Sequence, residues 1–246
     1  MMMKQLYNKQ NLILLLWAIL STYHAPAQEC VNDTLFEPML CGTIFIPPNG
    51  FQKSYYYCDE WKEASILLNS GDKVCGQLVK YNALLDAFIW KPAGKSYEVL
   101  LDGRLILSVT FKDIFGKPAH FIKPNAQSTV TFPGGDFFAE LLFSGKVRCF
   151  VSRKLRISGS TLKTINGITY QVKDLSPDWA YYLILPDGQP VNFAKIKQRK
   201  ILRAFPQAWR EPLAKALREN HLKLHDESDL IRFAEIIEQL PVASLN

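Results

Sequence analysis

The sequence predicts an α+β fold: a mainly antiparallel β-sheet, sandwich-like or open and barrel-like, followed by about three C-terminal helices. Turn signals recur about every ten residues between positions 61 and 196, a spacing typical of antiparallel β domains. Beyond residue 196 the apolar residues instead follow the period of a helix. Because strands come first and helices last, the order favours α+β over a parallel α/β fold.

Short apolar segments on both sides of turn residues indicate β-hairpins. We expect paired segments at 64–68 and 73–81, 97–101 and 104–111, 137–143 and 146–152, and 181–185 and 191–196, a strand at 168–172 after Asn166-Gly167, and a short strand at 43–46. The dipeptide Asp102-Gly103 is a strong hairpin signal, because both positions of the favoured two-residue turn need positive φ.

Two amphipathic patterns predict the main C-terminal helices. Trp209, Leu213, Ala216 and Leu217 recur at helical spacing in the first pattern, and Leu230, Phe233, Ile237 and Leu240 do so in the second. Asp226 precedes the second pattern and suits a helix N-cap. We expect both apolar stripes to be buried against each other or against the sheet.

The N-terminus resembles a cleavable secretory signal peptide spanning residues 1–27. Lys4 and Lys9 precede an apolar run at 11–20, and Ala25-Pro26-Ala27 forms an A-x-A cleavage site. The apolar run is too short for the bilayer core, which takes about 20 apolar residues. We therefore expect a mature chain that begins at Gln28 and is secreted to the periplasm, cell surface or exterior. No later segment is apolar enough to span a membrane.

The mature chain divides by composition into three parts. Residues 28–60 are irregular, rich in proline and contain three cysteines, whereas 61–196 form the antiparallel body and 197–246 the helical unit. An exported chain permits disulfides, so we expect at least one bridge among Cys30, Cys41, Cys58 and Cys75. Cys149 is expected to be a buried, unpaired thiol.

The net charge excludes a dedicated nucleic-acid surface. Removing Lys4 and Lys9 leaves 27 basic and 23 acidic residues, a mild excess of +4. Charge is nevertheless uneven, because residues 195–223 hold nine basic and two acidic residues, while 226–238 hold one basic and five acidic residues. We expect the acidic helix to pack beside the basic one with opposite charges along the rim. The alternative is an anionic partner on the basic stretch.

Several stretches together resemble a broad class of small, uncharacterised secreted proteins of Bacteroidota. They are residues 61–68, 76–82 with Asp86, 181–188, 200–202, 222–224 and 229–231. The resemblance covers most of the mature chain. It implies an envelope or exterior location and a β-rich body with a helical tail, and it implies no activity.

No motif in the sequence predicts a catalytic, cofactor-binding or metal site. His221 and His225 are four residues apart, but they fall in the expected connection between two helices, where that spacing does not align them for zinc. His120 has apolar neighbours and is expected to be structural. Cys149 lacks an assignable base, and Gly134-Gly135-Asp136 is interpreted as a turn rather than a phosphate loop. Carboxylates at Asp59, Glu60 and Asp86 could serve acid–base chemistry only across a cleft.

Aromatic clusters are the one positive functional signal. Tyr55, Tyr56, Tyr57 and Trp61 lie near the start of the body, and Trp179, Tyr181 and Tyr182 lie near its end. Aromatic side chains can bind sugars or partner chains, although we expect most of these to be core. The sequence thus favours a non-catalytic binding or structural module whose partner is an envelope or extracellular protein or glycan. The alternative is a secreted hydrolase acting on glycan or peptide.

Overall fold

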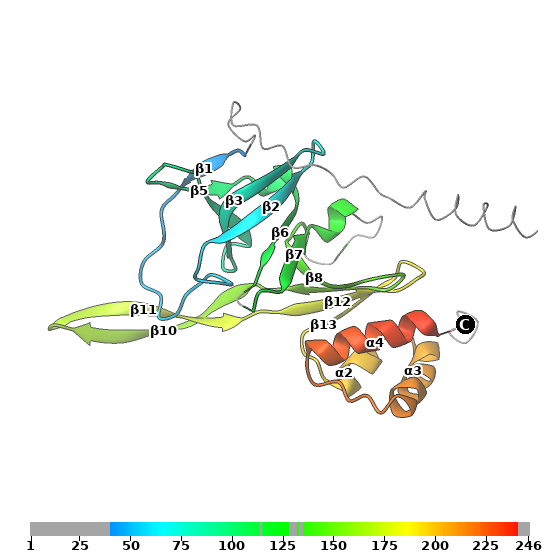
Figure 1. Ribbon diagram of the computed structural model, residues 1–246. Coiled ribbons are helices and arrows are strands. Elements are labelled where there is room, and N and C mark those ends of the chain that lie inside the picture. The colour runs from blue at the N-terminus through cyan, green and yellow to red at the C-terminus, as the bar shows by residue number, and fades with distance from the viewer. Residues whose placement is uncertain (1–39, 114, 128–131, 133–134, 241–246) are drawn as a thin grey trace, which may run out of the picture.

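The computed structural model describes residues 40–113, 115–127, 132 and 135–240 (Figure 1). The expected signal peptide, Gln28 and Cys30 lie outside these residues. Within the described ranges, no helix combines the length and hydropathy needed to cross a bilayer.

One open, antiparallel sheet of eleven strands forms the body. Its order is β1-β5-β4-β3-β2-β6-β7-β8-β9-β12-β13, and the described pairings within it are all antiparallel. The strands are β1 (Gly42–Phe45), β2 (Lys62–Leu68), β3 (Lys73–Asn82), β4 (Ala87–Lys91), β5 (Glu98–Leu101), β6 (Ile106–Lys112), β7 (Pro118–Ile122), β8 (Ala139–Ser144), β9 (Arg148–Ser152), β12 (Ala180–Ile184) and β13 (Pro190–Phe193). The predicted fold class is confirmed.

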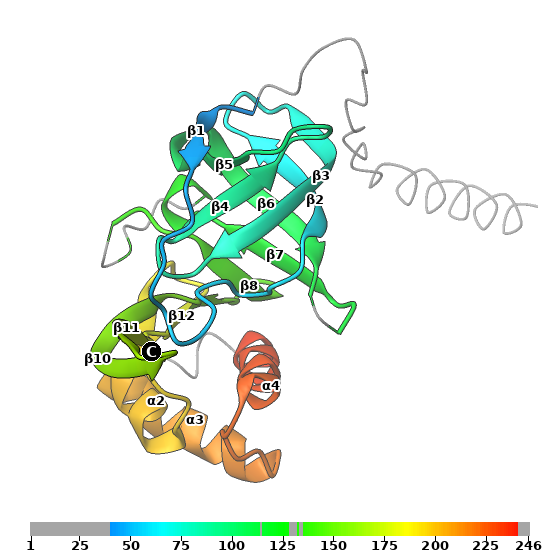
Figure 2. The same cartoon turned by 90° about the vertical axis from the view of Figure 1, so that its left-hand side faces the viewer.

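The sheet carries two main cores at its two ends. Residues of β2 to β7 surround an aromatic-rich core that includes Tyr81, Phe88 and Phe121. Strands β9, β12 and β13 share the other core with the helices α2 (Gln198–Ala204), α3 (Gln207–Glu219) and α4 (Glu227–Gln239). Figure 2 shows the helices beyond the far end of the sheet from β1, so the chain has a β end and a helical end.

The hairpins β2–β3, β8–β9 and β12–β13 form as predicted. The hairpin expected at Asp102-Gly103 is wrong, because β5 pairs with β4 and β1, whereas β6 pairs with β2 and β7. Asp102 has a φ of −69° and its carboxylate accepts the Arg104 N–H at 3.0 Å, which begins a 3₁₀ turn at Gly103–Leu105. The aspartate therefore acts as a cap, and the turn sends the chain across to the other side of β2.

A separate two-stranded ribbon leaves the sheet between β9 and β12. It consists of β10 (Leu155–Ile165) and β11 (Ile168–Pro177), and Figure 1 shows it projecting from the body. Asn166 and Gly167 have φ values of 52° and 78°, as a two-residue type I′ turn requires. Much of the ribbon is solvent-exposed, including the large side chains of Leu162 and Tyr170.

The helical end confirms the predicted buried stripes. Trp209, Leu213, Phe233 and Ile237 lie in one core with strand residues of the sheet. The side chain of Asp226 caps α4 by accepting the Asp229 N–H at 2.9 Å. One face of each helix is therefore buried: α4 packs against β8 and β9, and α3 packs against α2 and α4.

The expected charge pairing between α3 and α4 is not found among the described residues. The ion pair formed by α3 joins Lys215 to Glu219 within the same helix, at 3.8 Å. The acidic residues of α4 instead contact the sheet, where Glu238 accepts the Lys146 N–H at 2.6 Å and Glu227 binds Arg153. The negative charge of α4 therefore attaches it to β8 and β9, and the basic residues of α2 and α3 stay unpaired by it.

The cysteines agree in part with expectation. Cys149 is fully buried with a free thiol, and Cys41 and Cys58 are also free. Cys75 is not among the free cysteines, and Cys30 lies outside the described residues, so the expected disulfide stays a prediction.

We predict a Cys30–Cys75 bridge, and hence three free thiols in the exported protein. Thiol titration of the denatured, non-reduced protein should give three, and peptide mapping should place the bridge. A Cys41→Ser variant is the control, because it should lower the count by one without affecting the bridge. Five free thiols in the exported protein would contradict the prediction.

Candidate functional site

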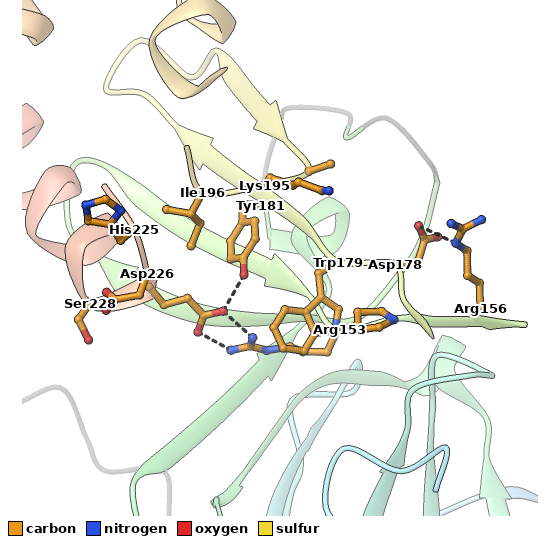
Figure 3. A pocket seen from close by; sticks show the side chains of 13 residues that line it. Arg153, Arg156, Asp178, Trp179, Tyr181, Lys195, Ile196, His225, Asp226 and Ser228 are labelled. Carbon is orange, nitrogen blue, oxygen red and sulfur yellow. Dashed lines mark hydrogen bonds and ion pairs between the residues drawn. The ribbon is translucent and has the colours of Figure 1, made fainter. Parts of the chain in front are cut away.

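Two cavities lie where the base of the ribbon, the sheet and α4 meet. The first has a volume of about 810 Å³ and is lined by residues of β10, β11 and β12, of the segments that follow β9 and β13, and of the α4 N-terminus. The second, of about 690 Å³, continues over the β-body beside Tyr56 and Tyr57. The two share the wall residues Arg153, Trp179, Glu227 and Ser228. This junction is the candidate site, and Figure 3 shows the first cavity.

Arg153 is the centre of the wall and binds two carboxylates. Its side chain is 7% exposed; Nε donates to Glu140 at 2.6 Å, while Nη1 and Nη2 donate to the two oxygens of Glu227 at 2.6 and 2.8 Å. Tyr181 donates its hydroxyl to Glu227 at 2.9 Å, and Tyr57 contacts Glu140 at 3.4 Å. Dashed lines in Figure 3 mark the hydrogen bonds that Arg153 and Tyr181 make in this network.

The local structure explains how these residues meet. Glu140 in β8 lies opposite Val151 of β9, and Arg153 follows directly after β9, so both charges reach the same end of the sheet. Tyr181 of β12 also lies opposite Val151. Glu227 is the first residue of α4, positioned by the Asp226 cap. The network therefore joins three strands to the start of α4.

Burial sets the electrostatics of the network. Desolvation raises the pKa of Glu140, and the charge of Arg153 offsets part of that rise. Burial alone would lower the pKa of Arg153, but hydrogen bonds and charge attraction from Glu227 and Glu140 raise it overall. Desolvation, with the nearby carboxylates, also raises the pKa of Tyr57 and Tyr181. The Arg153 guanidinium is thus shared by the carboxylates of Glu140 and Glu227, which are both partly removed from water.

Trp179 presents an aromatic surface at the junction. Its side chain is 38% exposed, and the Arg153 guanidinium lies 4.8 Å from the centre of the indole. Such a cation–π contact holds a large ring in place without covering both of its sides. Asp178 and Arg156, 4.0 Å apart, lie beside it, and Lys195 also lines the first cavity.

The structure places the histidines singled out in the sequence apart from this network, and one of them lies at its edge. His221 and His225 lie in the connection between α3 and α4, as expected, and His225 lines the first cavity. Within the described ranges, no three histidine, cysteine or acidic side chains gather as metal ligands would. His120 contacts Thr110 at 2.6 Å, and burial lowers its pKa, as for a structural histidine.

The remaining candidate carboxylates and the thiol have structural contacts. Asp86 binds Tyr81 at 2.7 Å and Lys154 at 2.9 Å, and desolvation raises its pKa. Glu60 pairs with Lys62 at 2.7 Å on the surface, and Ser54 donates to Asp59. Burial raises the pKa of the Cys149 thiol, which makes it a poor nucleophile.

Six of the seven sequence-predicted aromatics are buried or half-buried, and one is exposed. Tyr55, Tyr181 and Tyr182 are buried, and Trp61 with Tyr56 surrounds the ammonium of Lys80 at 4.8 and 4.9 Å. Trp179 is the exception. Sequence reasoning missed Arg153, Glu140 and Glu227 altogether. A signal was present, because Glu140 interrupts the apolar segment 137–143, and a charge buried in a strand needs a partner.

Comparison with known proteins found no match among protein-family models, curated proteins or solved structures. The junction combines two adjacent cavities, an indole held by Arg153, and one guanidinium paired with two carboxylates. A flat aromatic surface beside planar polar groups is suited to recognising a ligand that is itself part apolar and part polar.

Proposed function

We propose that this protein is a non-catalytic binding module of the cell envelope or exterior, and that it binds a glycan at the junction of the two cavities. The observation that carries the proposal is Trp179, held by Arg153 yet 38% exposed between two cavities. The C–H face of a sugar ring packs on an indole at little entropic cost, since the ring is already fixed.

The polar lining supports the same ligand class. Arg156, Asp178 and Ser228 surround the first cavity and offer donors and acceptors for hydroxyl groups. Because Trp179 lines both cavities, a chain of several sugar units could contact the indole from either cavity. This favours an oligosaccharide over a single small metabolite.

The ion pairs of Arg153 with Glu140 and Glu227 favour binding over catalysis. A glycosidase needs one carboxyl group free to donate a proton and a second free to attack or activate water. Here Glu227 accepts from Arg153 through both oxygens, and Glu140 accepts from Arg153 and lies beside the Tyr57 hydroxyl. Because these contacts are already made, the two carboxylates stabilise the fold and are not free for acid–base chemistry. A secreted hydrolase remains the alternative, favoured by the raised pKa of Glu140.

Trp179→Ala is expected to weaken glycan binding by about tenfold or more, because central aromatic residues dominate such contacts. The measurement is an array of neutral and acidic oligosaccharides, followed by calorimetry on those retained. Tyr97→Ala is the matched control: Tyr97 is similarly exposed at 43% but does not line either cavity. Equal affinities of the two variants would contradict the site. Shortening of a retained oligosaccharide, abolished by Glu140→Gln, would favour the hydrolase.

A further inference from the structure

The outer side of the helical end is strongly basic. We define the α2–α3 basic surface by its nine cationic side chains, all of them exposed. They are Lys195, Lys197, Arg199, Lys200, Arg203, Arg210, Lys215, Arg218 and Lys223. The cavities and the proposed glycan site leave most of these charges without a role.

This positive charge is not balanced from within the described chain. Glu211 and Glu219 are the acidic residues between positions 195 and 223, and the described ion pair there, Lys215 to Glu219, spans 3.8 Å between two exposed groups. Of the acidic residues of α4, Glu227 binds Arg153 and Glu238 accepts the backbone N–H of Lys146, and no ion pair among the described residues joins α4 to the basic surface. Like charges this dense destabilise a surface unless an anion binds it.

The charges are carried on a packed scaffold. Ile201, Phe205, Leu213 and Leu217 are buried beneath them. Arg210 donates to the backbone oxygens of Phe205 at 2.9 Å and Arg203 at 3.0 Å, which fixes α3 to the end of α2. A preformed array of cations loses little entropy when a polyanion binds.

The basic surface suits a soluble polyanion better than an acyl layer. In the described part of the chain, the large apolar side chains that are exposed all lie before residue 180, and none lies on α2 or α3. A membrane-surface helix would present such side chains for insertion. The basic surface adjoins the first cavity, because Lys195, where the surface begins, also lines that cavity, as does Arg156. A polyanion bound along the surface would therefore reach the proposed glycan site.

We propose that the glycan is acidic, and that its anionic groups bind the α2–α3 basic surface while its sugar rings occupy the cavities at Trp179. This inference rests on the proposed function, because it names the class of the glycan bound there. Carboxylate, sulfate or phosphate groups along the chain would each meet a lysine or arginine. The attraction of exposed charges is screened by salt, so affinity should fall as ionic strength rises.

The test compares one polymer in two charge states: oligogalacturonate and its fully methyl-esterified form, titrated into the mature protein. The chains are alike apart from the charge, so a difference in affinity reports the anionic groups. We expect the esterified form to bind at least about tenfold more weakly at low ionic strength, and the difference to shrink in high salt. Anionic phosphatidylglycerol vesicles serve as the competing probe.

The decisive variant is Arg199→Glu with Lys200→Glu, in the first turn of α2, where acidic residues are compatible with a helix. It should remove most of the charge-dependent part of oligogalacturonate binding. Lys112→Glu with Lys163→Glu is the matched control, since both lysines are exposed on the β-body and ribbon and the change in net charge is the same. Circular dichroism and thermal melting verify that both variants fold.

The outcomes separate the two proposals. Equal binding of both forms, lost only in Trp179→Ala, would overturn the acidic class and leave the proposed site standing. Charge-dependent binding that Trp179→Ala does not change would support the basic surface and overturn the cavity as the sugar site. Equal loss in both charge-reversal variants, binding to neither form, or binding only to the vesicles would each overturn the inference.

Discussion

Arg153→Met is expected to lower the free energy of unfolding by about 3–5 kcal/mol near pH 7, because removing one partner leaves buried charges uncompensated. Arg153 is the cation shared by Glu140 and Glu227, and the Glu140 side chain is only 11% exposed. Methionine retains the aliphatic part of the side chain and removes the guanidinium, so the loss would report mainly the missing charge and its hydrogen bonds. Urea unfolding at fixed pH measures it.

The loss should depend on pH. Burial already raises the folded-state pKa of Glu140, and without Arg153 the offsetting attraction disappears and the pKa rises further. A carboxyl group with a raised folded-state pKa contributes most stability below its unfolded pKa, and that contribution is lost as the pH rises through the folded value. Arg153→Met should therefore cost less at pH 4 than at pH 7. An equal loss at both would contradict a buried carboxylate as the cause.

Neutralising the whole network provides the control. Adding Glu140→Gln and Glu227→Gln to Arg153→Met removes the charges together, and buried ionic clusters replaced as a unit are often close to neutral in stability. The triple variant should therefore recover much of the loss at pH 7. Failure to recover would show that Arg153 stabilises the fold through packing on Trp179 and Tyr57 rather than through charge.

Phe233→Ala should destabilise by about 3–5 kcal/mol, the usual loss when a buried aromatic site is emptied. Phe233 has no exposed surface, packs edge-on against Phe205 with ring centres 5.9 Å apart, and lies in the core that joins α4 to the sheet. Chemical denaturation measures the change. Phe115→Ala is the matched control, because Phe115 is 78% exposed and its loss should change stability by less than about 0.5 kcal/mol. Similar values for both would place Phe233 outside a cooperative core.

Local signals in the sequence predicted the elements that local forces decide. Asn166-Gly167 predicted the tight turn at the ribbon tip, and the stripe containing Phe233 predicted the buried face of α4. The signal at Asp102-Gly103 misled because aspartate also caps turns, and both structures use the same short side chain. Whether Asp102 begins a hairpin or caps a turn depends on which strands pair with β5 and β6. Of those strands, β1 and β2 are distant from Asp102 in the sequence.

The candidate site was the part least accessible from sequence. Arg153, Glu140 and Glu227 come from three elements, and nothing in the local pattern shows that β8, β9 and α4 converge. The predicted charge pairing of α3 with α4 failed for the same reason: α4 lies against the sheet, which offers its acidic residues better-placed partners. Periodicity shows which face of a helix is buried, whereas ion pairing depends on what covers that face.

The ribbon enters and leaves the sheet at one point. Ser152 and Ala180 lie opposite each other in the β9–β12 pair, and Asp178 donates its backbone N–H to the Lys154 oxygen at 2.9 Å. The strand order is therefore complete without β10 and β11. Residues added in matched pairs would lengthen the ribbon by about 3.3 Å each without changing the register of β9 and β12. Arg153 and Trp179 lie between these two contacts, so the length of the ribbon can vary while the binding junction stays the same.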